Sequence, residues 1–486
     1  MERKKTVAVN IVWRFAERCG AQLVAAIVSI VLARILDPDV YGTVALISVF
    51  TTILQVFVDS GLGNALIQKK QADNLDFSTV FFTNIIFCAI LYLLLFISAP
   101  AIALFYSDLS LIPYIRVLGI TILISGVKNV QQAYVSKHML FKKFFFSTLG
   151  GTITACVVGV SMAVAGFGVW ALIAQQLINL SIDTCILWIT VKWRPERRFS
   201  MERLKGLFRY GWKLLASSLL DTGYRELQSL LIGRIYTSEN LAYYNQGQRI
   251  PVLVVSNINS SIDSVLLPTL SDLQDEKKRV KEMTRRAMKT SIYLMAPMMM
   301  GLIATGTPLI QLLLTEKWLP CLPFFRIFCI TYMFYPLHTA NLNAIKAMGR
   351  SDLFLRLEIW KKATGLLVLC GTIWISVEAM AYSLLVTSVL SQIINSWPNR
   401  KLLGYGYVEQ MKDILPSIDL AAAMAAAVYP ISLLNMPGLV ILALQVAAGT
   451  VLYLLGSVVF RMEAFCYLLD LVKPYIMKRK ESRHCG

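Results

Sequence analysis

Apolar stretches long enough to cross a membrane recur along nearly the whole chain of 486 residues. A transmembrane helix needs roughly 20 mostly apolar residues to cross about 30 Å of hydrocarbon. The chain is 56% hydrophobic and only 16% charged, which is more apolar than a soluble core requires. No connection between the stretches is long enough to form a soluble domain. We therefore predict an all-α, polytopic membrane protein with about 14 transmembrane helices.

The predicted spans cover residues 9–36, 42–67, 78–105, 112–136, 148–166, 169–191, 210–236, 241–267, 290–314, 322–347, 353–376, 379–398, 417–434 and 438–460. The first five residues are basic, as in a signal peptide, but Glu17 and Arg18 interrupt the apolar region that follows. We expect this segment to remain as the first helix.

Basic residues alternate between the connections in a way that predicts the orientation of the helices. The connections on one side, together with both ends of the chain, carry clusters of Lys and Arg, whereas those on the other side carry a single cation, Lys317. Cytoplasmic loops of membrane proteins are enriched in Lys and Arg. We therefore place both termini in the cytoplasm. The net charge of +18 lies mainly in these short loops, so we expect no nucleic-acid partner.

Short sequences recur in the two halves of the chain, six predicted spans apart. The matches pair residues 33–35 with 233–235, 58–60 with 262–264, and 116 and 121 with 326 and 331. Chance similarity in apolar sequence explains one match more easily than three in register. A repeat of six spans preserves orientation, so we predict two parallel six-helix lobes. These are residues 1–200 and 201–401, and residues 402–486 form two additional helices and a basic cytoplasmic tail.

Charged residues inside the predicted spans are more often basic than acidic. Lys and Arg outnumber Asp and Glu there, so pairing would leave several cations over. An unpaired charge at mid-bilayer costs about 2.5–3.5 kcal/mol or more. Cations near helix ends, such as Arg34 and Arg116, can reach the headgroups. We expect the others to line a water-filled cavity between the two halves, which would attract phosphate, pyrophosphate or carboxylate groups.

The candidate residues for binding such an anion are Arg14, Arg18, Lys128, Lys213, Arg225 and Arg249. Buried structural ion pairs, for example between Arg14 and Glu17, are the alternative interpretation. Three intramembrane acids, Asp59, Asp221 and Asp263, are candidates for coupling to an ion, with ion pairing as the alternative for each.

No residue pattern indicates catalysis or a bound cofactor. The three histidines are scattered, the nine cysteines lack the paired spacing of a metal site, and no Gly-rich phosphate loop precedes a basic residue. We therefore predict no catalytic residue, no metal and no cofactor other than a coupling proton or sodium ion. The protein is not expected to be an enzyme.

The last two predicted spans differ from the others, because residues 420–460 contain no charged residue. We interpret these helices as facing lipid. They either border a groove for an acyl or prenyl tail or are simply exposed to the bilayer.

Three segments carry a resemblance to a known family. They are Leu32–Pro38 with Tyr41 and Gly42, Asp59–Gly63 continuing to Gln68, and Gly166–Leu172. The chain resembles the polysaccharide transporters, or Wzx-type flippases, of the multidrug/oligosaccharidyl-lipid/polysaccharide exporter superfamily. The resemblance covers essentially the whole chain and implies a location in the bacterial cytoplasmic (inner) membrane.

The resemblance also implies a function. Such a flippase moves an undecaprenyl-pyrophosphate-linked oligosaccharide to the outer leaflet for the synthesis of lipopolysaccharide, exopolysaccharide or capsule. It would work as a secondary transporter by alternating access of the two lobes, coupled to a proton or sodium gradient or to the membrane potential. The implied partners are the lipid-linked oligosaccharide, membrane lipids, and a polysaccharide polymerase with its glycosyltransferases.

Other functions stay open at this point. A lipid II flippase of the same superfamily differs only in its cargo, and a multidrug cation antiporter should line its cavity with acids. A membrane glycosyltransferase or polymerase is less compatible, because it would need a sizeable extramembrane loop for its catalytic groups.

The cationic cavity leads to a prediction about two residues that lie more than two turns from the nearest predicted helix end. Reversing the charge with Arg225→Glu or Arg249→Glu should abolish export, because a carboxylate repels an anionic cargo, while the protein still folds and inserts. Surface polysaccharide and membrane-inserted protein would be measured in the same cells. Unchanged polysaccharide in both variants would contradict the cationic-cavity mechanism.

Overall fold

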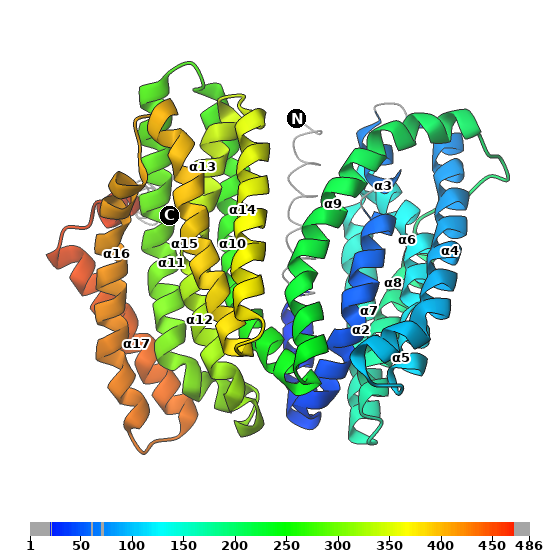
Figure 1. Cartoon of the computed structure of the whole chain (residues 1–486), viewed down its shortest axis with the longest axis horizontal. Helices are drawn as coiled ribbons and strands as arrows, with labels where there is room; N and C mark the ends of the chain where they lie inside the picture. Colours follow the sequence, from blue (N-terminus) through cyan, green and yellow to red (C-terminus); the bar gives the residue numbers. More distant parts are fainter. Residues whose placement is uncertain (1–19, 21, 60–61, 70–71, 471–486) are drawn as a thin grey trace, which may run out of the picture. The chain divides into compact units, whose positions relative to one another are not determined.

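A computed structural model describes residues 20, 22–59, 62–69 and 72–470, and all regular structure in this part of the chain is helical (Figure 1). The helices in the first half are α2 (Pro38–Asp59), α3 (Leu62–Gln68), α4 (Asn74–Tyr106), α5 (Leu111–Leu118), α6 (Ile120–Lys137), α7 (Phe141–Val164), α8 (Val169–Thr190) and α9 (Met201–Ile235). The later helices are α10 (Ser238–Asp272), α11 (Lys277–Leu313), η1 (Glu316–Cys321), α12 (Leu322–Met333), α13 (Tyr335–Ala347), α14 (Ser351–Thr372), α15 (Val377–Leu402), α16 (Tyr407–Val428), η2 (Tyr429–Leu433) and α17 (Gly438–Val459).

Eleven helical segments of the described chain are long and apolar enough to cross a membrane, which confirms the all-α, polytopic class. Three other predicted spans are also helical but do not have this length or apolar composition. Gln22–Ile35 is short, because much of the predicted first span lies outside the described residues. Helices α9 and α14 carry several charged residues in their middle turns. The expected count of 14 spans stays a prediction.

The chain divides into two compact units, Met1–Ala242 and Tyr243–Gly486. In the first unit, α7 and α8 form a tightly packed hairpin, α6 packs against α4 and α8, and α9 contacts α2, α3 and α4. In the second unit, α11 contacts α12, α13, α16 and α17. The predicted lobes, 1–200 and 201–401, follow the sequence repeat and stay a prediction. In this division α9 belongs to the first compact unit.

The turn between α7 and α8 explains one of the sequence patterns noted above. Gly166 and Gly168 have φ angles of 83° and 51°, a left-handed region that is costly for residues with a side chain. Two glycines separated by Phe167 therefore close the hairpin within a few residues.

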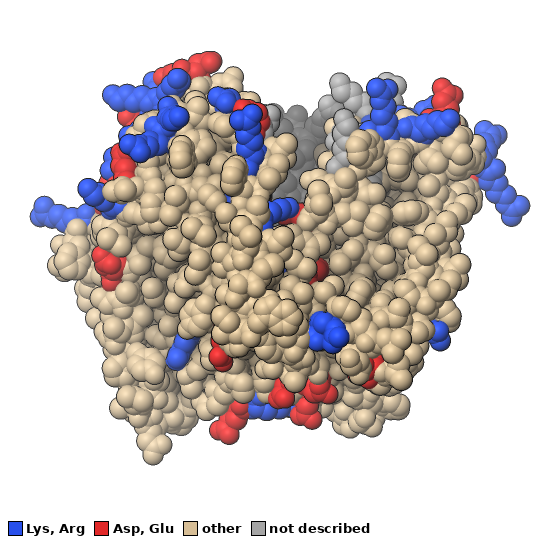
Figure 2. Space-filling model, in the orientation of Figure 1, with Lys and Arg blue, Asp and Glu red and all other residues tan. Residues whose placement is uncertain are grey.

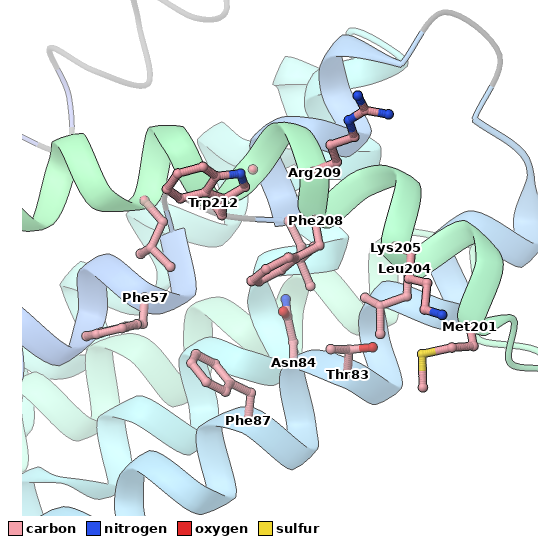
Figure 3. Close-up of a pocket in the computed structure, with 13 residues that line it drawn as sticks. Phe57, Thr83, Asn84, Phe87, Met201, Leu204, Lys205, Phe208, Arg209 and Trp212 are labelled. Atoms are coloured by element: carbon pink, nitrogen blue, oxygen red, sulfur yellow. The ribbon is translucent and has the colours of Figure 1, made fainter.

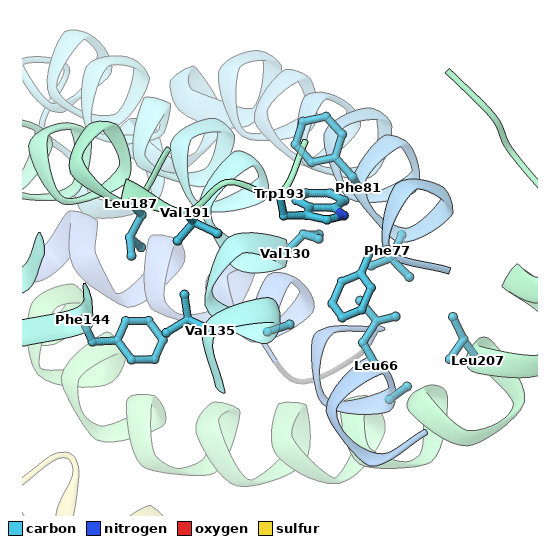
Figure 4. Packing of buried hydrophobic residues seen from close by; sticks show 13 residues of the cluster. Leu66, Phe77, Phe81, Val130, Val135, Phe144, Leu187, Val191, Trp193 and Leu207 are labelled. Atoms are coloured by element: carbon cyan, nitrogen blue, oxygen red, sulfur yellow. The ribbon is translucent and has the colours of Figure 1, made fainter. Parts of the chain in front are cut away.

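An aromatic and aliphatic cluster packs the helices together at the end of the first unit where α4 begins (Figure 4). Phe77 and Phe81 of α4 pack against Trp193, with ring centroids 5.8 and 6.2 Å away, and Leu66 of α3 and Leu207 of α9 belong to the same cluster. The cluster joins α3, α4, α6, α7, α8 and the start of α9, and four of these helices, α6 to α9, also line the cavity described below.

Buried Asp76 adds a polar connection at the same end. It forms a capping box with Asp73 at the start of α4. Its carboxylate also accepts ion pairs from Lys69 at 2.6 Å and from Arg203 of α9 at 3.4 Å. The backbone N–H of Asp76 donates to the carboxylate of Asp73, and this bond lowers the pKa of Asp73. One carboxylate therefore ties α3, α4 and α9 together.

Basic side chains gather at one end of each unit, as Figure 2 shows. In the first unit this end carries the Asp76 cluster and the segment after α8. The distribution agrees with the alternation of charge along the sequence. The cytoplasmic location of this end stays a prediction from the positive-inside rule.

The close packing of α7 on α8 can be tested with one glycine and a control. A Cβ atom on Gly151 would lie 2.7 Å from the carbonyl oxygen of Asn179, so Gly151→Ala should overpack the hairpin and lower the free energy of unfolding by about 1–3 kcal/mol. Gly223→Ala in α9 meets nothing within 4 Å and should be neutral or stabilising by up to about 1 kcal/mol. Thermal unfolding in detergent compares the two. Equal midpoints would contradict the packing described here.

Candidate functional site

A polar cavity of about 780 Å³ lies inside the first unit, among helices that are long enough to span the membrane. Its lining comes from α2, α6, α7, α8 and α9 and consists of Thr51, Thr52, Gln55, Val56, Asp59, Thr121, Ser125, Lys128, Gln132, Thr148, Gln176, Asn179, Leu180, Asp183, Thr222, Arg225 and Glu226. Polar side chains within membrane-spanning helices are costly unless they pair or face water, so they mark a functional site.

The central feature of the cavity is an ion pair between α6 and α8. The Nζ atom of Lys128 lies 2.6 Å from an oxygen of Asp183, and the two side chains are only 12% and 9% exposed. The other carboxylate oxygen of Asp183 is buried without a hydrogen-bond partner among the described residues. Beside this pair α7 packs closely against α8, because Gly151 has no side chain and a Cβ atom there would lie 3.1 Å from the Cβ of Asp183.

A chain of amide side chains holds Asp59, at the end of α2. Gln55 donates to both carboxylate oxygens at 3.2 Å, and Asn129 of α6 donates at 3.4 Å. Asn84 of α4 in turn donates to the amide oxygen of Asn129 at 3.3 Å. The hydrogen-bond donors to Asp59 are therefore neutral amides, so its carboxylate can still pair with a cation.

The third charged group of the lining lies on α9. Arg225 pairs with Asp221 at 3.0 Å across one turn, and both side chains are more than half exposed. Glu226, the next residue, also lines the cavity. Such an exposed pair is weak, so Arg225 can exchange its partner at little cost.

The charges of this lining do not show the expected surplus of cations. Lys128 and Arg225 are basic, whereas Asp59, Asp183 and Glu226 are acidic. Both cations are also paired with carboxylates. The cavity inside the first unit is thus polar and internally paired. A cationic cavity between the two halves of the chain stays a prediction.

The other predicted anion-binding residues lie elsewhere. Arg14 and Arg18 are outside the described residues, and so is the side chain of Lys213. Arg249 is on α10 in the second unit.

The three acidic candidates for ion coupling are also separated. Asp59 and Asp221 belong to the first unit. Asp263 is on α10 in the second unit and accepts a hydrogen bond from Asn343 at 2.8 Å. Among the described residues no group of three or more His, Cys, Asp or Glu is placed to hold a metal ion.

Sequence reasoning counted Asp183 among the intramembrane acids but did not assign it to the site. It also missed the amides, above all Gln55, Asn129 and Asn179. The signal that could have found them is the recurrence of Asn and Gln inside apolar spans, where each amide needs a partner.

Comparison with known proteins defines the class of the molecule. A family model described as "Polysaccharide biosynthesis protein" matches residues 31–323. The chain is 28% identical over 442 residues to the teichuronic acid biosynthesis protein TuaB of Bacillus subtilis, covering 87% of this chain and 86% of TuaB. It is 24% identical over 471 residues to the succinoglycan biosynthesis transport protein ExoT of Rhizobium meliloti, covering 94% and 92% of the two chains.

The lipopolysaccharide biosynthesis protein WzxC of Escherichia coli is 22% identical over 338 residues, 68% of either chain. The fold is similar to that of the lipid II flippase MurJ in an inward closed conformation, with a TM-score of 0.73 at 14% identity, covering 93% of this chain and 98% of MurJ. An inward-facing multidrug transporter of the MATE family has a TM-score of 0.62 at 16% identity, covering 79% and 94%.

The helices and the fold define a multi-pass membrane protein with a fold similar to those of MurJ and the MATE transporter. The chain belongs to the polysaccharide biosynthesis protein family. This confirms the resemblance found in the sequence.

The buried pair of the cavity leads to a prediction about stability. Lys128→Met alone should lower the free energy of unfolding by about 3–5 kcal/mol, because it leaves Asp183 charged and buried without its partner. Replacing both residues, Lys128→Met with Asp183→Leu, should restore most of the loss, since neutral side chains need no partner. Thermal unfolding in detergent measures both variants. A double variant as unstable as the single one would contradict the pairing.

Proposed function

We propose that this protein moves an undecaprenyl-pyrophosphate-linked oligosaccharide from the cytoplasmic to the periplasmic leaflet of the bacterial inner membrane, where surface polysaccharide is assembled. Membership of the polysaccharide biosynthesis family supports this proposal, as does the name of ExoT, a transport protein. The observation that carries it is the membrane-embedded polar cavity with Lys128 and Arg225 in its lining. A pyrophosphate needs cations and hydrogen-bond donors, which hydrocarbon does not offer.

The mechanism follows from the way the charges are paired. A pyrophosphate entering the cavity would take the place of Asp183 at Lys128 and of Asp221 at Arg225, which currently lie at 2.6 and 3.0 Å. Released Asp183, whose side chain is only 9% exposed, would then remain charged in a buried site, which is costly. A proton or a sodium ion can neutralise this carboxylate. The exchange of partners would thus itself couple binding of the cargo to binding of an ion.

Asp59 is a further candidate for the coupling ion, together with Asp221 and Asp263. It lies in the same lining as Lys128, and its present partners are neutral amides. A cation bound there would lose no existing ion pair. Asp59 can therefore bind an ion without the loss of an ion pair, whereas Asp183 can do so only after the cargo has taken its place at Lys128.

Transport proceeds in this proposal by alternating access of the lobes 1–200 and 201–401, with the termini in the cytoplasm. The glycosyltransferases deliver the cargo at the cytoplasmic leaflet, and a polymerase receives it on the other side. The sugar residues hydrogen-bond with amides of the lining such as Gln132, Gln176 and Asn179.

A second function is favoured by one observation. The lining holds three acids and two bases, which suits the cation exchange of a multidrug antiporter, and the fold is also similar to that of a MATE transporter. Transport of a cationic dye by the purified protein would support this alternative. Lysis of cells on depletion would instead indicate a lipid II flippase.

The proposed function predicts the behaviour of the neutral double variant in cells. Lys128→Met with Asp183→Leu should insert and remain stable yet fail to restore surface polysaccharide to a host that lacks the protein, because the cavity has lost a cation for pyrophosphate. Lipid-linked oligosaccharide should accumulate in the cytoplasmic leaflet. The control is Arg197→Gln with Arg198→Gln, two exposed cations outside the cavity lining. Normal polysaccharide in the neutral variant would refute the role of Lys128.

A further inference from the structure

A second hollow in the first unit has a different chemistry from the cavity. It is a groove of about 620 Å³ between α4 and the first turns of α9, with a contribution from α2 and α3. Figure 3 shows its side chains, among them Phe57, Phe87 and Phe208, which come from three different helices. The rings of Phe57 and Phe87 lie 5.9 Å apart. The lining is therefore mostly apolar and aromatic.

The first turns of α9 have two distinct sides. On one side Leu207 is buried in the cluster of Figure 4, and Arg203 pairs with Asp73 and Asp76 at 3.3 and 3.4 Å. On the other side Met201, Phe208 and Trp212 line the groove, and the latter two are 55% and 48% exposed. The helix is thus fixed by one side and presents apolar side chains with the other.

Two cations accompany this apolar side. Lys205 and Arg209 both line the groove, are one helical turn apart and are exposed. Neither forms an ion pair with a described residue, in contrast to Arg203 two positions earlier. Both are in the first turns of α9, which lie at the end of the first unit where Figure 2 shows basic side chains gathering (Figures 1 and 2). An apolar groove with two free cations beside it is complementary to a molecule that has a hydrocarbon chain and an anionic head.

We propose that this groove binds one anionic glycerophospholipid of the adjacent leaflet, with an acyl chain among Phe57, Phe87 and Phe208 and the phosphate near Lys205 and Arg209. Basic residues beside apolar surface at a membrane interface recognise such lipids. A volume of about 620 Å³ is that of a drug-sized ligand, which matches an acyl chain and is small for a long polyprenyl chain. The site would hold this lipid whatever cargo the protein transports.

The floor of the groove connects it to the polar cavity. Asn84 lines the groove and donates to Asn129, which donates to Asp59 in the cavity lining. A bound lipid would therefore exclude water from one end of the hydrogen-bond chain that holds Asp59. Occupancy of the groove and the state of Asp59 are linked in this way.

The test is a lipid titration of the purified full chain in detergent, followed by native mass spectrometry. Phosphatidylglycerol should bind, and Lys205→Gln with Arg209→Gln should weaken its binding about 25-fold, because each lost cation contributes about fivefold. Arg197→Gln with Arg198→Gln removes the same charge outside the groove and should leave binding within about twofold. Zwitterionic phosphatidylcholine should bind the wild-type protein no better than it binds the groove variant.

A second measurement locates the acyl chain. Phosphatidylglycerol with a photoreactive acyl chain should label peptides that contain Phe57, Phe87 or Phe208 more strongly than peptides of α17, and excess unlabelled phosphatidylglycerol should suppress that labelling. Equal weakening by the two charge variants, or labelling spread evenly over the helices, would overturn the proposal. Displacement by a polyprenyl phosphate but not by phosphatidylglycerol would also overturn it, since the occupant would then be a different lipid.

Discussion

In the hydrocarbon of a membrane, charged and amide side chains are costly unless they have a partner, and this constraint shapes the first unit more than any other. Lys128 of α6 meets Asp183 of α8, and Asn84 and Asn129 connect α4 and α6 with Asp59 at the end of α2. These contacts join helices that are far apart in the sequence. They also leave a polar space in the membrane, because the side chains around them cannot all be buried in apolar surroundings.

Helix α9 connects the features that we associate with function. Its first turns carry the groove cations Lys205 and Arg209, and its later turns carry Arg225 and Glu226 of the cavity lining. The buried carboxylate of Asp76 holds the start of this helix through an ion pair with Arg203, 3.4 Å away. A displacement of α9 would therefore alter both sites together.

Much of the architecture could be predicted from the sequence, because the length of each apolar stretch and the alternation of Lys and Arg between loops are visible in neighbouring residues. The partners of the intramembrane charges could not, since Lys128 and Asp183 are 55 positions apart and meet only through the packing of α6 against α8. The pair of Asp221 and Arg225 could have been predicted from the sequence, because residues four positions apart are neighbours on a helix. The expected surplus of cations came from counting charges without knowing their partners. In the described cavity both cations are paired with carboxylates, and the cationic cavity between the two halves stays a prediction.

The central claim is that a pyrophosphate replaces a carboxylate as the partner of Lys128 and Arg225. The most direct measurement is the affinity of the purified protein for a lipid-linked oligosaccharide that carries pyrophosphate, compared with the same lipid and sugar joined by an uncharged linkage. Replacement predicts much tighter binding of the pyrophosphate form and the uptake of protons or sodium ions on binding. Equal affinity for the two lipids would contradict it.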